Sequence, residues 1–150
     1  TGERDLIPMA KHFGMTLLPW APLAGGALTG KYLRGEQGRI KPESKRLNEN
    51  SVAVTKEVVA IADELNVAPS SIAMQWIRQQ DIPAIPIVGA TRLSQLEENL
   101  KVLDVHLSGE QMKRLDNISK IELGFPGEFF NEAGVKQNNF GGFYDKIIKR

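Results

Sequence analysis

The sequence predicts an α/β protein in which helices cover parallel strands. Two apolar segments, residues 15–26 and 81–89, have the length and composition of buried strands. The second is apolar on both faces, as a parallel strand between two layers of helices is. A long stretch with helical periodicity separates the two segments. A strand, a long crossover and a second strand in one sheet make a parallel pair.

The elements before the crossover follow from local patterns. Residues 2–14 predict a helix with Leu6, Met9 and Phe13 on one broad apolar side together with Ile7 and Ala10, ending at Gly14. The first strand closes in two prolines and two glycines, which indicates a loop with exposed backbone. A polar connection without apolar periodicity follows over residues 35–50.

Helical periodicity returns at Val54, and Thr55 is the predicted N-cap of a helix that ends near Asn66. Its predicted buried positions are Val58, Val59, Ile61, Ala62 and Leu65. Pro69 suits the first turn of the next helix, whose predicted inward positions are Ile72, Ala73, Trp76 and Ile77.

After the second strand, residues 92–103 predict a helix with two neighbouring stripes. Arg92, Gln95 and Asn99 are spaced by three and four residues, which places them on one stripe. The second stripe is apolar and consists of Leu93, Leu96, Leu100 and Leu103. Because the polar stripe borders the apolar one instead of lying opposite, we expect a polar ligand there.

The last predicted helix has Ser108 as its N-cap and Gln111 three residues on, which is a capping box. From Glu122 the chain predicts an ordered tail rich in Gly, Phe and Asn. Two parallel strands are too few for a stable sheet, because their edges and faces need further strands. The remaining strands are therefore expected from elsewhere.

Composition excludes several classes of protein. Nineteen basic and eighteen acidic residues leave a net charge of +1, which argues against a general electrostatic grip on nucleic acid or on an acidic membrane. The chain has no cysteine, so disulfides and thiolate metal sites are excluded and a cytoplasmic location is expected. It contains no apolar run near the roughly 18 residues of a membrane span, and no secretory signal pattern.

Two long motifs carry a resemblance to a known family. WAPLAGGALTGKY, followed at a distance by IPIVGATRLSQLEENL, resembles the C-terminal portion of an aldo-keto reductase, of the kind that includes bacterial reductases and potassium-channel beta subunits. The resemblance covers nearly the whole chain, including the tail motif IELGFP. It implies one partial domain over residues 1–150: the last two strands of a (β/α)8 TIM barrel, their helices and a C-terminal extension.

The resemblance also implies an NADP(H) site at the C-terminal ends of these strands, where barrel sites lie in general. Gly89, Ala90 and Thr91 match a turn at the adenosine 2′-phosphate, and Arg92 adds a fork of donors for a phosphate. Gln95, Glu98 and Asn99 match helix residues around the phosphate and the adenine. A further match is the segment that wraps the cofactor, which consists of Trp20, Ala21, Pro22, Leu23, Ala24 and Gly25. Lys31 matches a lysine at the cofactor phosphates, and Arg46 matches an arginine over its adenosine. Trp20 would form an aromatic wall beside the nicotinamide.

The catalytic residues of the family are expected outside this chain. The family reduces aldehydes and ketones with an Asp, Tyr, Lys and His set that lies on earlier strands. Tyr32 and Tyr144 match none of those positions, so we expect no turnover by this chain alone. His12 and His106 have no partner at metal-ligand spacing. The glycines of GGALTG do not fit the G-x-G-x-x-G fingerprint, which excludes a Rossmann motif as their explanation.

Each site residue also has an ordinary interpretation. Arg92 and Lys31 are of the type that is usually a solvated surface charge, and a tryptophan such as Trp20 usually packs in a core. At the level of the whole chain, the alternative to a reductase portion is a non-catalytic scaffold that associates with itself. In that case the open strand edges would pair between copies.

Overall fold

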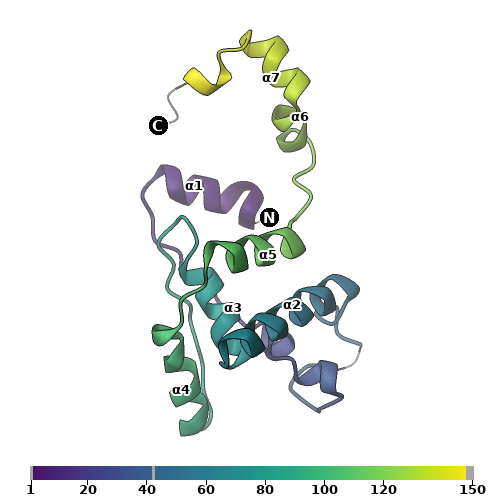
Figure 1. Ribbon diagram of the computed structural model, residues 1–150, viewed down its shortest axis with the longest axis vertical. Coiled ribbons are helices and arrows are strands. Elements are labelled where there is room, and N and C mark those ends of the chain that lie inside the picture. Colours follow the sequence, from purple (N-terminus) through teal and green to yellow (C-terminus); the bar gives the residue numbers. More distant parts are fainter. Residues whose placement is uncertain (1, 42, 148–150) are drawn as a thin grey trace. The chain divides into compact units, whose positions relative to one another are not determined.

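The computed structural model describes residues 2–41 and 43–147 (Figure 1). They form two compact units. Residues up to Met15, together with those from Ile121 on, make the first unit, and the segment from Thr16 to Lys120 makes the second. All the predicted site residues belong to the second unit.

The first unit begins with the predicted helix over residues 2–14. A π-helical segment, Gly2–Leu6, leads into α1, Ile7–His12. Gly14 has a φ of 62°, a left-handed conformation that favours glycine, so the predicted end of this helix is confirmed.

The tail is ordered and peripheral, as predicted. It forms α6, Gly127–Asn131, then α7, Ala133–Phe140, and a 3₁₀ turn, Tyr144–Lys146, and none of these contains a buried residue. Its start is held to the first helical segment by Arg4, whose Nε and Nη2 donate to the carbonyl oxygen of Glu122 at 3.1 and 2.6 Å.

The core of the second unit lies between three helices. These are α2, Glu49–Leu65, α3, Pro69–Arg78, and α5, Gly109–Ser119, and α2 contacts both of the others. The buried core residues are Val58, Ile61, Ala62, Ile72, Ala73, Val105, Leu107 and Leu115. Five of these eight are positions that helical periodicity predicts for α2 and α3. Ser108 and Gln111 form the predicted capping box at the start of α5.

The start of α2 corrects the sequence prediction. The helix begins at Glu49, with Asn48 as N-cap in a capping box with Ser51, whereas Thr55 was the predicted cap. Thr55 is buried inside the helix, and its hydroxyl donates to the Ser51 carbonyl oxygen at 2.6 Å. Apolar periodicity starts only at Val54 because α2 opens with two exposed polar residues, Glu49 and Asn50, followed by Ser51.

The predicted strand pair is reduced to two isolated parallel bridges in the described chain, Leu17 with Ala84 and Trp20 with Ile87. Leu17 N donates to Pro83 O at 2.8 Å, Ile85 N to Leu17 O at 2.9 Å and Ile87 N to Pro19 O at 3.0 Å. The parallel direction is therefore as predicted. Regular strands do not form because prolines lack the N–H that a ladder needs, and four of them lie in these segments: Pro19, Pro22, Pro83 and Pro86.

The prediction that these segments are buried is wrong for the chain as described. Leu18 and Ile85 are each 61% exposed, and Ile87 and Val88 are also exposed. The predicted apolar stripe is exposed as well. It runs along α4, Leu93–Leu100, and the 3₁₀ turn that follows, Lys101–Asp104. Its four members, Leu93, Leu96, Leu100 and Leu103, are all exposed. Burial needs a second surface, and no described element of this unit provides one.

A polar network links α2 to α5. Arg114 donates to Glu57 Oε1 at 2.6 Å and to Glu64 Oε1 at 2.7 Å, and Gln111 donates to Glu64 Oε2. The hydrogen bond from Arg114 is the largest cause that lowers the pKa of Glu64. A lowered carboxyl pKa stabilises the fold above the ordinary pKa of glutamate, and this contribution is lost as the pH falls through the lowered pKa.

No helix in the part of the chain that the structure describes is long and apolar enough to cross a membrane. Among the same residues, no group of three or more His, Asp or Glu side chains could hold a metal ion.

Candidate functional site

A half-buried turn with several positive φ angles follows the first bridge segment. Ala21, Ala24, Gly25 and Gly26 all have positive φ angles, of 54°, 50°, 73° and 100°. A left-handed conformation costs a non-glycine residue about 1 to 3 kcal/mol, and such strain is concentrated at ligand sites. A 3₁₀ segment, Ala24–Thr29, continues the turn, and Thr29 Oγ1 closes it by donating to Gly26 O at 2.8 Å.

Two cationic side chains converge on the paired glycines. A Cβ atom built on Gly25 would lie 2.6 Å from Nη1 of Arg46, and one built on Gly26 would lie 3.5 Å from Nζ of Lys31. Neither cation forms an ion pair with a carboxylate of the described residues. Lys31 Nζ lies over the ring of Tyr32, 5.4 Å from its centroid. The turn therefore presents backbone between two cations without a carboxylate partner among the described residues, which is an arrangement suited to a phosphate.

The loop behind this turn is held by Tyr32. Its hydroxyl accepts a hydrogen bond from Ile40 N at 2.8 Å. A pocket of about 360 Å³ lies in the same loop, and its lining contains three cations and one carboxylate: Arg39, Ile40, Lys41, Glu43, Ser44 and Arg46. The positive charge at Arg46 is thus part of a wider basic region.

The second group of predicted site residues lies at the start of α4. Thr91 donates to Gln95 Oε1 from its backbone nitrogen at 3.0 Å and from Oγ1 at 3.1 Å. Arg92 is the N-cap, and its exposed side chain makes no capping hydrogen bond. Gly89 has open space around its α-carbon. Gln95 N and Leu96 N donate to Arg92 O at 3.1 and 3.3 Å, which leaves the N–H groups of Leu93 and Ser94 at the helix start, where anions are attracted.

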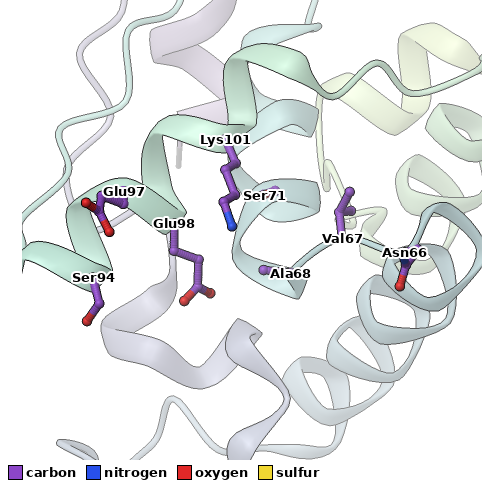
Figure 2. A pocket seen from close by; sticks show the side chains of 8 residues that line it. All are labelled: Asn66, Val67, Ala68, Ser71, Ser94, Glu97, Glu98 and Lys101. Carbon is purple, nitrogen blue, oxygen red and sulfur yellow. The ribbon is translucent and has the colours of Figure 1, made fainter.

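A pocket of about 680 Å³ lies between α4 and the start of α3 (Figure 2). Its lining residues are Asn66, Val67, Ala68, Ser71, Ser94, Glu97, Glu98 and Lys101. Figure 2 shows Glu98 and Lys101 extending from α4 and its following turn toward the segment that carries Ala68. Glu98 Oε1 accepts a hydrogen bond from Ser70 Oγ at 3.3 Å, which ties α4 to the first turn of α3.

The structure places the predicted residues in two groups with one common neighbour. The first group surrounds the glycine turn and the second lies on α4, and α3 packs against both. Within the first group, Leu23 packs against the hydrophobic core. Trp20 is 76% exposed, so it is not a core residue, and Asn99 is half-buried on α4.

Of the eight residues that line the pocket between α4 and the start of α3, only Glu98 is a predicted site residue. Lys101 follows α4 directly, and Ser71 lies in the first turn of α3. Ser71 is 1% exposed, and its Oγ has no hydrogen-bond partner. A serine in the first turn of a helix is so common that no local pattern distinguishes this one.

A comparison with known protein families identifies the family of this chain. The model of the Aldo/keto reductase family matches residues 2–120, which is most of the chain. The chain belongs to the aldo/keto reductase family. The match covers both motifs on which the resemblance rests and all the predicted site residues.

Relatives within the aldo/keto reductases are aryl-alcohol dehydrogenases. The chain is 31% identical to the putative aryl-alcohol dehydrogenase AAD10 of Saccharomyces cerevisiae, over 92% of this chain and 51% of that protein. It is 32% identical to the aryl-alcohol dehydrogenase [NADP(+)] of Phanerodontia chrysosporium, over 96% of this chain and 40% of that protein. The chain thus spans about half or less of the length of these two relatives. A shorter relative, the putative aryl-alcohol dehydrogenase YFL057C of Saccharomyces cerevisiae, is 28% identical, over 83% of this chain and 86% of its own length.

Proposed function

We propose that this chain supplies the NADP(H)-binding subsite for the adenosine and phosphates in an aldo/keto reductase. The observation that carries the proposal is the convergence of Lys31 and Arg46 on Gly25 and Gly26. One cation on a surface is ordinary, whereas two cations that form no ion pair with a described carboxylate and lie against a glycine backbone suit the pyrophosphate of a dinucleotide. Positive φ angles at this turn keep side-chain bulk away from the approaching phosphate.

The start of α4 suits the second phosphate, the one that distinguishes NADP(H) from NAD(H). Thr91 and Arg92 stand at the helix N-terminus, where backbone N–H groups and the helix dipole favour an anion. Gln95 already holds Thr91 in place through two hydrogen bonds. Gly89 and Ala90 complete this turn, and the proposed adenine contacts are Glu98 and Asn99.

The reaction of the whole protein is proposed from its relatives. The names of the relatives specify aryl alcohols and, for the Phanerodontia protein, NADP(+). We therefore propose hydride transfer between NADP(H) and a small aldehyde or ketone, with an aromatic aldehyde as the first choice. The proton donor to the carbonyl would come from outside this chain, since Tyr32 matches no position of the family's catalytic set and its hydroxyl holds a loop by accepting the Ile40 N–H.

The phosphate cradle is tested by titrating NADPH into the chain and into Lys31→Gln and Arg46→Gln. Losing a charge-assisted hydrogen bond costs about 1.5 to 3 kcal/mol, so each variant should bind NADPH about ten- to a hundredfold more weakly. Arg34→Gln is the matched control, because Arg34 lies in the same segment but already pairs with Glu36 at 2.5 Å. Unchanged affinity in the double variant Lys31→Gln, Arg46→Gln would overturn the proposal.

A second candidate function rests on a different observation. Exposed apolar side chains line both bridge segments and α4. They would suit a scaffold that associates with itself, or a surface that receives the rest of a barrel. A scaffold that associates with itself forms an oligomer of this chain, whereas a surface that receives the rest of a barrel does not require one.

A further inference from the structure

Gly30 lies where the glycine turn meets α2. It ends the 3₁₀ segment Ala24–Thr29 with a φ of 78° and directly precedes Lys31. A Cβ atom built on Gly30 would lie 2.8 Å from Cγ2 of Val59, well inside the separation of about 3.5 to 4.0 Å at which carbon atoms pack. A side chain of any size at position 30 would therefore collide with α2.

Val59 is poorly suited to give way to such a side chain. Valine is β-branched and has one strongly preferred rotamer in a helix. Val59 is half-buried on α2, next to the core residue Val58. The other close atom, Nη1 of Arg34 at 3.2 Å, is the far end of a long side chain and can move. The missing Cβ of Gly30 is thus what allows the turn to lie directly against α2.

Further contacts hold the same turn to the helix. Thr55 is 3% exposed, and its Oγ1 donates to Ser51 O at 2.6 Å and lies within hydrogen-bond distance of Ala27 O at 3.4 Å. Leu23 and Leu28 pack against the hydrophobic core that α2 helps to form. The turn is therefore fixed against α2 and its core at the start, in the middle and, at Gly30, at the end.

We propose that the close approach of Gly30 to Val59 positions Lys31 for the cofactor phosphates, which makes both of them positioning residues of the NADP(H) site. Because Lys31 follows Gly30 in the chain, a displacement at Gly30 moves the lysine away from Gly26, beside which its Nζ lies. α2 carries no predicted cofactor contact, so it acts through the turn. This assignment rests on the proposed function, since it takes the pyrophosphate of NADP(H) as the ligand of the turn.

Gly30→Ala and Gly35→Ala form a matched pair of variants. The two glycines bracket the segment Lys31–Arg34 with left-handed φ angles of 78° and 73°, so alanine meets similar backbone strain at either position. A Cβ atom on Gly35, however, would meet no atom within 4 Å. Gly30→Ala should raise the dissociation constant for NADPH about tenfold, as the loss of one charge-assisted hydrogen bond does, and Gly35→Ala should change it less than about threefold. Equal effects would mean that backbone strain is the cause, which would overturn the proposal.

A second ligand separates positioning from general damage to the fold. Adenosine 2′-monophosphate carries the base and the 2′-phosphate but lacks the pyrophosphate that is proposed to bind at the turn. Gly30→Ala should therefore leave its dissociation constant as in the unaltered chain. If Gly30→Ala weakened the binding of NADPH and of adenosine 2′-monophosphate by the same factor, Gly30 would have a structural role only.

Val59→Ala tests the same contact from the side of α2. It causes no collision but withdraws the packing of valine, so NADPH should bind about threefold more weakly. In the double variant Gly30→Ala, Val59→Ala, the new methyl group takes the space that valine leaves, and the dissociation constant for NADPH should return to within about threefold of the unaltered chain. If Gly30→Ala alone does not fold, a double variant that folds and binds NADPH supports the proposal. A double variant that stays unfolded, or that binds as weakly as Gly30→Ala, overturns it.

The failure of this inference differs from the failure of the proposed function. If the unaltered chain binds NADPH and Gly30→Ala leaves the dissociation constant unchanged, the positioning role is overturned and the cofactor site stands. If the unaltered chain binds no NADPH, the proposed function falls and this assignment falls with it.

Discussion

Arg92 stands at the N-cap of α4 with an exposed side chain that makes no capping hydrogen bond. The sequence offers two interpretations, a solvated surface charge or a contact to the 2′-phosphate, and the structure keeps the side chain available for the second. Thr91 differs, because Gln95 already engages both its backbone nitrogen and its hydroxyl. Replacing Arg92 therefore tests the charge at this turn, whereas replacing Thr91 tests its local hydrogen bonds.

Arg92→Ala should reduce the preference of the chain for NADPH over NADH by about one to two decades. Only NADPH carries the 2′-phosphate, and a charge-assisted hydrogen bond is worth about 1.5 to 3 kcal/mol. Both dissociation constants are to be measured at one fixed ionic strength, since salt screens phosphate contacts. Thr91→Ala should have a smaller effect. If Arg92→Ala weakened the binding of NADPH and NADH equally, Arg92 would be a surface charge that supports the helix and does not bind the 2′-phosphate.

At the scale of elements, caps define the helices more sharply than apolar periodicity does. α5 begins at the capping box of Ser108 and Gln111, which is visible in the sequence. α2 begins at Glu49, directly after its N-cap Asn48, which lies in the segment that lacks apolar periodicity. Its capping box uses Ser51 in place of the usual Glu or Gln, so the S/T-x-x-E/Q pattern does not reveal it.

Asn48→Ala should destabilise the chain by about 0.5 to 2 kcal/mol, the range for losing an N-cap side chain. The reason is that Asn48 Oδ1 accepts from Ser51 N at 2.9 Å, a donor without a partner inside the helix. Urea unfolding followed by circular dichroism measures the change. Asn50→Ala makes the same chemical change within the first turn and should leave stability level or higher, because alanine favours helix. If both variants behaved alike, Asn48 would not be the cap in solution.

At the scale of the whole molecule, the second unit has a buried core between three helices and an uncovered apolar surface elsewhere. Leu18, Ile85 and the leucines of α4 belong to that surface. Open backbone edges of paired segments recruit further strands, and exposed apolar patches mark contact surfaces. We propose that these segments are interior in a complete barrel, which would account for an apolar pattern on a surface.

We expect the chain alone to self-associate, with a sedimentation coefficient that rises with concentration. Ile85→Lys should shift the distribution toward the monomer, because a buried lysine without a partner is costly at an interface. Ile118→Lys is the matched control, since Ile118 is an exposed isoleucine on α5 outside the paired segments. A compact monomer that unfolds cooperatively at every concentration would contradict the expectation.

Local patterns by themselves determined the amphipathic helices, the α5 cap, the end of the first helix and the parallel direction of residues 17–20 and 84–87. These features depend on side-chain period and on residues a few positions apart, which a sequence displays directly. The two motifs also identified the family. For α4 the pattern did not determine that its apolar face is covered, as its exposed leucines show.

Only the tertiary structure decided the rest. The strand segments form single bridges because ladder hydrogen bonds depend on distant partners and on prolines in both segments. Lys31 and Arg46 meet at Gly25 and Gly26 although the loop between them has no regular pattern. Ser71 is distinguished by a missing partner, and a missing contact is a property of packing. Contacts between residues far apart in sequence arise when elements pack. No local pattern along the chain therefore predicts an individual contact of this kind.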